Sequence, residues 1–168
     1  MRTIKLTLLA AMFSLVLASP AGARSIGNPV LDDEEKAFCT QINKYRDQNG
    51  LAPLRLSVSL ARASKWKSLD MAASNVFSHT DTQGRNFSTR LGAFGYTFAT
   101  SKAENIAAGN PTSARTFDQW RNSAGHNAAM LDPSYTVFGI GRAYNPAATY
   151  RWYWTADFGG YTDRTTPC

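Results

Sequence analysis

The sequence predicts an α+β fold in which helices pack on a small antiparallel sheet. Helical patterns come early in the chain and strand patterns come late, a separation typical of this class. The clearest strand pattern lies near the C-terminus, where large apolar residues recur at every second position and therefore share one face. These residues are Tyr150, Trp152, Trp154, Ala156 and Phe158. A length of 168 residues suits a single domain.

Each expected helix begins at a capping or acidic signal and ends where the pattern is interrupted. In the first, Phe38, Ile42 and Tyr45 recur at helical spacing after an acidic opening turn. Ser57 and Thr112 are residue types that cap helix N-termini. The expected helices run from Asp32 to the stop at Asn49-Gly50, from Ser57 through Met71, from Thr112 through Trp120, and from Gly125 to Asp132-Pro133.

Three strands complete the expected fold. They cover Ala103–Ala108, Thr136–Tyr144 and Tyr150–Phe158. Asn145-Pro146 supplies the turn between the last two. We interpret residues 51–56 as a connector, and residues 74–102 as turns and short pieces because glycines interrupt the pattern there.

The composition excludes several classes of protein. Hydrophobic residues make up 43 % of the chain and aromatic residues 12 %, which excludes a disordered or low-complexity protein. The formal net charge is +6, but most basic residues stand singly, without a run of five or more. A nucleic-acid-binding surface needs clustered basic residues. We therefore expect a solvated basic surface and no nucleic-acid partner.

The first residues have the composition of an export signal. Two basic residues precede an apolar run of 13 residues at 6–18, and Ala21-Gly22-Ala23 supplies the small residues that a signal peptidase recognises. A membrane span needs about 20 apolar residues, so we favour a cleaved signal over an uncleaved anchor. The sequence thus predicts a secreted protein, extracellular or periplasmic, with a signal peptide at 1–23, a flexible lead-in at 24–33 and no membrane span.

Cys39 and Cys168 are the two cysteines of the chain. In an oxidising compartment the default is a disulfide between them. In the chain-entropy model, a bridge that closes so long a loop contributes up to about 5 kcal/mol. The alternatives are two free thiols, or Cys168 bonded to a partner chain. Neither cysteine lies in a local nucleophile signature, so we interpret the pair as a structural bridge.

His79 and His126 are the two histidines, and Glu104 is the one glutamate after Glu35. Small or apolar residues flank all three, which indicates partial burial. Two neutral imidazoles and a carboxylate form a ligand set that zinc or another divalent ion accepts. Their spacing, however, matches no usual metal motif. Spacing alone therefore favours buried polar groups that are satisfied by hydrogen bonds.

Four segments occur in an order that resembles a known family. They are Phe77-Ser78-His79-Thr80, Ala103-Glu104-Asn105-Ile106-Ala107, the stretch from Trp120 to Leu131, and Tyr153-Trp154-Thr155-Ala156-Asp157-Phe158-Gly159. Together they resemble the cysteine-rich secretory and pathogenesis-related protein superfamily, the CAP or SCP-like domain, and most closely its short bacterial secreted branch. The resemblance covers about residues 34–160 and leaves 161–168 as a C-terminal tail. It implies an α-β-α sandwich with a shallow cleft.

In fuller members of this family the cleft holds a His-Glu-Glu-His tetrad, sometimes with zinc or another divalent ion. By motif, His79 and His126 match the two histidines and Glu104 matches the first glutamate. The second glutamate is replaced by Ser123, a poor zinc ligand. The resemblance therefore implies a cleft formed by these four residues. In it, His79, His126 and Glu104 are the metal ligands, or Glu104 instead orients a histidine through a hydrogen bond.

His126 is expected near the start of a short helix, where the helix N-terminus disfavours positive charge. We therefore expect a neutral imidazole that is able to bind a metal.

The resemblance implies two functions from different classes. The first is a secreted, non-catalytic monomer that uses the cleft, with or without a divalent metal such as zinc, to bind a partner or a small apolar ligand. Family members bind lipids, sterols and cell-envelope ligands. The second is a metal-dependent, peptidase-like hydrolase with His79 and His126 on the metal and Glu104 as the base. Ser123 favours binding, because hydrolysis needs a general base that a second carboxylate would have supplied. A third hypothesis is that the chain is a purely structural protein of the cell envelope.

Overall fold

A computed structural model describes residues 29–168 of the chain. The predicted signal peptide and residues 24–28 of the predicted lead-in lie outside the described residues. The elements follow one another in this order: α1 Asp33–Gln48, β1 Arg55–Ser57, α2 Val58–Ser74, α3 Phe87–Ala93, β2 Lys102–Ala108, α4 Ser113–Arg121, α5 Ala124–Leu131, β3 Val137–Tyr144, β4 Trp152–Gly159 and β5 Thr165–Thr166. The four helices and three strands that the sequence predicts are all present.

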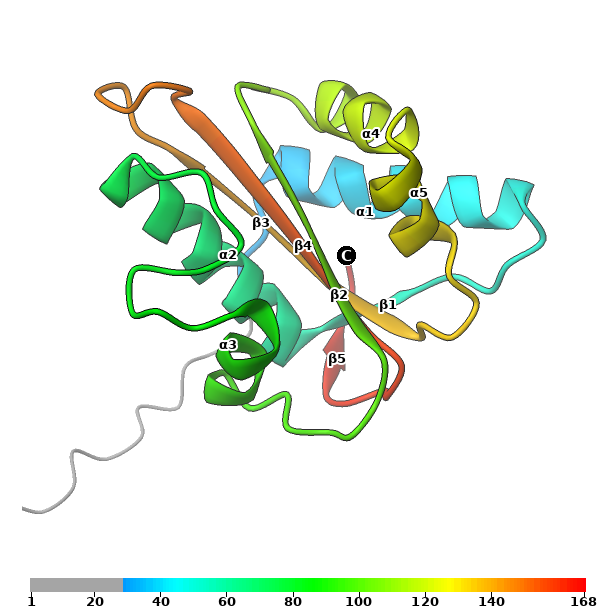
Figure 1. Ribbon diagram of the computed structural model, residues 1–168. Helices are drawn as coiled ribbons and strands as arrows, with labels where there is room; N and C mark the ends of the chain where they lie inside the picture. The colour runs from blue at the N-terminus through cyan, green and yellow to red at the C-terminus, as the bar shows by residue number, and fades with distance from the viewer. Residues whose placement is uncertain (1–28) are drawn as a thin grey trace, which may run out of the picture.

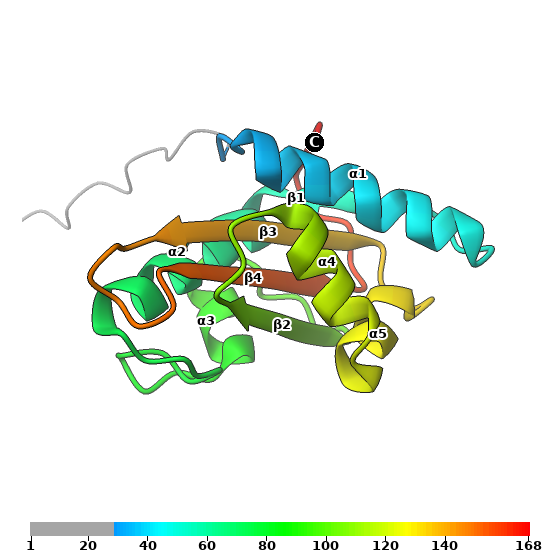
Figure 2. The same cartoon turned by 90° about the horizontal axis from the view of Figure 1, so that it is seen from above.

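The strands form one sheet with the order β2-β4-β3-β1-β5. Figures 1 and 2 show α1, α4 and α5 on one face of this sheet and α2 and α3 on the other. The predicted α-β-α sandwich is therefore confirmed. The sheet is mixed rather than antiparallel throughout, because β1 pairs with β3 in parallel, with Arg55 opposite Val137. The expectation that residues 51–56 form only a connector is therefore wrong, because residues 55 and 56 belong to β1.

The elements that the sequence analysis missed are short. β1 has three residues and β5 has two, too few for an alternating pattern to be visible. α3 has seven residues, and the side chain of Asn86 caps it by accepting a hydrogen bond from the main-chain nitrogen of Thr89 at 2.9 Å. A helix of this length depends on its cap and its packing rather than on a long apolar stripe.

The alternating pattern of β4 defines the larger core. Trp154, Ala156 and Phe158 are fully buried and belong to the same apolar cluster as residues of α1 and α4. In that cluster the rings of Phe38 and Trp120 meet edge to face, 5.2 Å between centroids. The shared face expected for this strand is therefore confirmed. Tyr150 is the exception, because it precedes the strand and is 49 % exposed.

Two glycines let α2 lie directly on β3. A Cβ atom at Gly139 would stand 2.2 Å from the main-chain nitrogen of Ala61, and one at Gly141 would stand 2.3 Å from that of Lys65. Ser68 of α2 donates a hydrogen bond to the main-chain oxygen of Gly141 at 2.8 Å. This close contact fixes α2 on the sheet, and with it the loop that follows α2.

The predicted disulfide between Cys39 and Cys168 is confirmed, with 6.0 Å between the two Cα atoms. It joins the middle of α1 to the end of the chain. The residues expected to form a C-terminal tail contribute β5, in which Thr166 pairs with Leu56 of β1. The bridge therefore holds the last strand of the sheet in place.

Candidate functional site

His79 and Glu104 are in contact at the outer strand of the sheet. Glu104 lies on β2, and His79 lies in the loop between α2 and α3. The Nδ1 atom of His79 is 2.8 Å from Oε1 of Glu104. The side chain of Glu104 has no exposed surface, whereas 54 % of the His79 side chain is exposed. The pair thus presents an imidazole to solvent with a carboxylate beneath it.

A buried arginine occupies the second oxygen of Glu104. Arg90 of α3 is fully buried, and its Nη2 donates a hydrogen bond to Oε2 of Glu104. Its Nη1 donates to the main-chain oxygen of His79 at 3.2 Å. A carboxylate can only accept hydrogen bonds, so the proton between Glu104 and His79 lies on Nδ1 of the imidazole. The free nitrogen of His79 is therefore Nε2.

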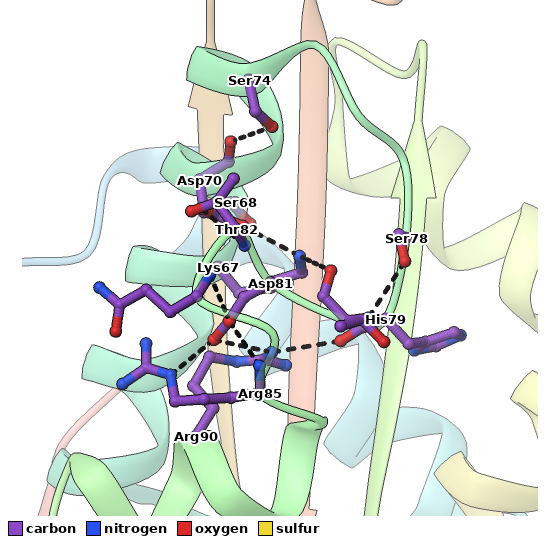
Figure 3. Close-up of polar contacts among 12 residues, drawn as sticks. Lys67, Ser68, Asp70, Ser74, Ser78, His79, Asp81, Thr82, Arg85 and Arg90 are labelled. Carbon is purple, nitrogen blue, oxygen red and sulfur yellow. Dashed lines mark hydrogen bonds and ion pairs between the residues drawn. The ribbon is translucent and has the colours of Figure 1, made fainter.

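The loop between α2 and α3 is held by buried polar contacts, which Figure 3 shows. Lys67 is 1 % exposed and donates to the main-chain oxygen of Thr80 and to Asp70, both at 3.1 Å. Asp81 accepts from both the main-chain nitrogen and Nε of Arg85, at 2.9 and 2.8 Å. Since the charged groups that fix this loop are paired, the loop has a defined position without an apolar core of its own.

Asp157 lies beneath the same site on β4, directly opposite Glu104. It is fully buried, and its Oδ2 accepts a hydrogen bond from Ser64 at 2.7 Å. Its Oδ1 has no hydrogen-bond partner among the described residues. Burial, followed by the nearby charge of Glu104, raises the pKa of Asp157 well above its usual range. The available sequence signal for this residue is an acid within an otherwise apolar strand, which alone does not indicate a functional role.

His126 belongs to the helical layer on the opposite face of the sheet from α3 (Figure 1). It lies on α5, and its Nδ1 is 2.9 Å from the hydroxyl of Ser123. Asn105 of β2 donates to the main-chain oxygen of His126 at 3.0 Å. The imidazole also packs near the ring of Trp120, 6.3 Å between centroids. Nδ1 is thus occupied in both imidazoles, and Nε2 is the nitrogen left for a ligand.

The two imidazoles influence one another electrostatically. Burial lowers the pKa of His126, and the nearby charge of His79 lowers it further. The sequence predicts a neutral imidazole because of the helix N-terminus, whereas the leading cause of the lowered pKa of His126 is burial. The structure thus brings the four predicted residues together as two hydrogen-bonded pairs, His79 with Glu104 and His126 with Ser123. We call His79, Glu104, Ser123 and His126 the histidine site.

The histidine site fits a divalent ion only in part. Neutral imidazole nitrogens suit zinc, but a catalytic zinc site has three protein ligands and a structural site has four. Both oxygens of Glu104 are engaged, by His79 and by Arg90. Across residues 29–168, no three or more His, Cys, Asp and Glu residues gather as a metal site requires. Glu104 therefore matches the second role that the resemblance allowed, orienting His79 through a hydrogen bond.

Several cavities lie outside the histidine site, among them one of about 360 Å³ between β1 and the C-terminal residues 165–168. One of about 250 Å³ is mainly apolar and is formed against α2, with Leu31, Trp66, Leu69 and Phe94 among its lining residues. A smaller one, of about 150 Å³, lies beside the loop that carries His79. No residue of the histidine site lines any of these cavities. An apolar ligand in the cavity against α2 would therefore not touch the imidazoles.

The fold and the site together define a class of protein. It is an α-β-α sandwich in which a loop and a short helix, one from each layer, place two imidazoles beside an outer strand that carries a buried glutamate. The sequence model of the cysteine-rich secretory protein family, CAP, matches residues 40–158. The chain belongs to this family.

Relatives are found among bacterial proteins. The chain is 35 % identical over 108 residues to the protein YkwD of Bacillus subtilis, and the match covers 64 % of this chain and 41 % of YkwD. It is 32 % identical over 107 residues to the membrane protein YlbC of the same organism, with 64 % and 31 % covered. The chain thus spans well under half the length of these two relatives.

Solved structures show the same fold. An extracellular protein of Bacillus anthracis with an SCP domain superposes with a TM-score of 0.63 at 26 % identity, covering 80 % of this chain and 45 % of that one. An outer surface protein of Borrelia burgdorferi gives a TM-score of 0.70 at 19 % identity, with 79 % and 97 % covered. Within residues 29–168, no helix has the length and apolar character that a membrane crossing requires.

Proposed function

We propose that the chain is a secreted, non-catalytic binding protein whose ligand contacts the imidazoles of His79 and His126. The observation that carries this proposal is the state of Glu104, whose two oxygens are occupied by His79 and Arg90. A general base must be free to accept a proton from the reacting group. Ser123 adds no carboxylate in its place. The hydrolase alternative therefore lacks its base, whereas binding needs none.

Secretion is part of the proposal. The export signal predicted for residues 1–23 supports it, as does the likeness to the extracellular protein of Bacillus anthracis. The disulfide between Cys39 and Cys168 also favours an oxidising compartment, extracellular or periplasmic. In such a place a cell-envelope component, a lipid or a sterol is within reach of a monomeric domain.

The proposed binding site includes a divalent metal such as zinc. The Nε2 atoms of His79 and His126 would hold it, with water completing the coordination. Bound there, the ion would supply a positive centre for an anionic or polar group of the ligand. Glu104 would orient His79 from behind rather than bind the ion.

Zinc titration calorimetry on the purified chain tests this arrangement. We expect binding that is lost in His79→Ala and in His126→Ala and kept in Asp118→Ala, which removes an exposed carboxylate elsewhere. Glu104→Gln keeps the ligands but weakens the orientation of His79, so zinc affinity should fall by about 10–100-fold. Zinc binding that survives both histidine substitutions would contradict the proposed ion site.

A parallel assay separates binding from hydrolysis. We expect no cleavage of a pool of fluorogenic peptides by the zinc-loaded chain. Cleavage that disappears in Glu104→Gln, while circular dichroism shows that the variant is still folded, would instead establish the hydrolase.

A further inference from the structure

Asp157 is a buried carboxyl group that the proposed function does not use. It lies on β4, is fully buried, and stands directly opposite Glu104 of β2. The main-chain N–H of Gly160 donates to Ser101 at 3.1 Å, so Glu104 and Asp157, three residues further along each strand, share no main-chain hydrogen bond. Side chains of such a pair stand closest together in an antiparallel ladder. The register thus sets two carboxyl groups side by side, away from water.

Two ionised carboxylates are incompatible with this position. Like charges directly opposite one another in a sheet repel, and burial raises the cost because water no longer screens them. A dedicated cation would offset the repulsion. Among the described residues, however, Arg90 forms ion pairs with Glu104 and Asp81 and none with Asp157. Ionised Asp157 would therefore be a buried charge without a counterion, so one of the two opposed carboxyl groups holds a proton.

The hydrogen bonds identify Asp157 as the group that holds it. Glu104 accepts from Nδ1 of His79 and from Nη2 of Arg90, and both contacts stabilise its ionised form. Asp157 accepts from the hydroxyl of Ser64, and its Oδ1 has no partner among the described residues. Burial, followed by the charge of Glu104, raises the pKa of Asp157. An ionised Oδ1 would be an unsatisfied buried acceptor, whereas a protonated Oδ1 is a donor within reach of Glu104.

We propose that Asp157 is a neutral carboxylic acid that donates a hydrogen bond to Glu104 and thereby positions the histidine site from beneath. Donors on His79, Arg90 and Asp157 then hold the carboxylate of Glu104, which has about four acceptor positions. Each donor restricts the rotation of this carboxylate, so it stays directed at Nδ1 of His79. Asp157 is a positioning residue, because it acts on the imidazole through Glu104 and contacts neither the ion nor the ligand.

This inference rests on the proposed function, because it names what holds His79 of the same site in its binding orientation. It also fixes the charge beneath the imidazoles. With Asp157 neutral, the charges of Glu104 and Arg90 balance one another. An ionised Asp157 would add a net negative charge beneath the site.

Infrared spectroscopy of the purified chain detects the proton directly, because the C=O group of a carboxylic acid absorbs apart from ionised carboxylates and amides. Exposed carboxyl groups are ionised at neutral pH, so we expect an acid band there from Asp157. The band should vanish in Asp157→Asn and shift in Ser64→Ala, which removes the hydrogen bond to the same carboxyl group. Ser74→Ala, whose hydroxyl bonds to a main-chain oxygen, should leave the band unchanged. A neutral-pH spectrum without an acid band, or a band that persists in Asp157→Asn, would overturn the inference.

A matched pair of variants tests the positioning role. Asp157→Asn keeps a donor for Glu104 and an acceptor for Ser64, whereas Asp157→Val removes both and suits a strand. We expect the zinc affinity of Asp157→Asn to stay within about twofold of the parent chain and that of Asp157→Val to fall about tenfold. Circular dichroism confirms that each variant is folded. Equal weakening in both variants would contradict the inference, because both substitutions remove the negative charge of an ionised Asp157. Unchanged affinity in both would contradict the positioning role.

NMR of the imidazole nitrogens supplies a readout that needs no metal. His79 should carry its proton on Nδ1 in the parent chain and in Asp157→Asn, and should exchange between its two neutral tautomers in Asp157→Val. The same tautomer in all three chains would overturn the positioning role. If Asp157→Val does not fold, a loss of the Nδ1 proton in Asp157→Asn would overturn it.

Failure of this inference and failure of the proposed function give different results. Zinc binding that depends on both histidines, in a chain without the acid band, would overturn the neutral Asp157 and leave the proposed function standing. The acid band, in a chain whose zinc binding survives His79→Ala and His126→Ala, would support the neutral Asp157 and contradict the proposed ion site.

Discussion

The two histidines of the site are held by different kinds of contact. The His79 arm, residues 75–86, is fixed by buried charged side chains, among them Lys67 and Arg90. The His126 arm, helix α5, is joined to β2 through the neutral amide of Asn105, and the buried Arg46 of α1 donates to the main-chain oxygen of Met130, the one buried residue of the helix. Among the described residues, the His79 arm is thus held by buried ion pairs, whereas the His126 arm is held by hydrogen bonds to amide and main-chain groups.

This difference predicts how each arm fails. Removing one member of a buried ion pair leaves its partner charged and without water, so the loss is large. Removing a neutral hydrogen bond costs less, because the freed group can be hydrated by a small local movement. The His79 arm should therefore stay fixed until the domain unfolds, and the His126 arm should loosen by degrees.

The largest expected effect follows from Arg90→Met. The substitution leaves Glu104 buried without its cation and removes a donor to the main chain of His79. We expect the free energy of unfolding to fall by about 3–5 kcal/mol, measured by denaturant titration. Arg121→Met is the control, since Arg121 pairs with Asp118 at the surface, and it should cost less than about 1 kcal/mol. Equal losses of unfolding free energy in the two variants would contradict the inference that a buried ion pair holds the His79 arm.

Much of this arrangement could be predicted from the sequence. Local patterns indicated the longer helices and strands, because spacing and caps are encoded within each segment. The family motif identified His79, Glu104, Ser123 and His126. The sequence could not show that Glu104 is already paired, because Arg90 lies in a short helix within a stretch interpreted as turns.

Residues whose roles depend on pairing across the sheet were the ones missed. Asp157 matters because the register sets it opposite Glu104, and no local pattern encodes a register between strands so far apart in the chain. The same holds for the outer position of β2, which follows from the order of the strands. Hydrophobic patterning does not specify that order.

A smaller effect is expected in the His126 arm. Asn105→Ala removes the donor to the main chain of His126, which should cost about 1–2 kcal/mol of unfolding free energy. Amide hydrogen exchange should accelerate in α5 while the His79 arm keeps its protection. Asn43→Ala removes a comparable amide bond, to the main-chain oxygen of Leu54 at 3.0 Å, and should leave exchange in α5 unchanged. Faster exchange in residues 75–86 would show that the arms are not independent.

The smallest effect is a dependence of stability on pH that originates in the His126 arm. Burial, then the charge of His79, lowers the pKa of His126, so the folded state favours the neutral imidazole. Its contribution to stability is complete above the unfolded pKa of about 6.5 and is lost as the pH falls through that value toward the lower folded pKa. Unfolding free energies between pH 8 and pH 5, measured with a chelator present, should therefore decline less steeply in His126→Gln than in the parent chain. His79→Gln removes one of the two causes and should raise the pKa of His126, which NMR titration of the imidazole measures. An unchanged pKa in that variant would mean that the two arms do not place their imidazoles within electrostatic reach of one another.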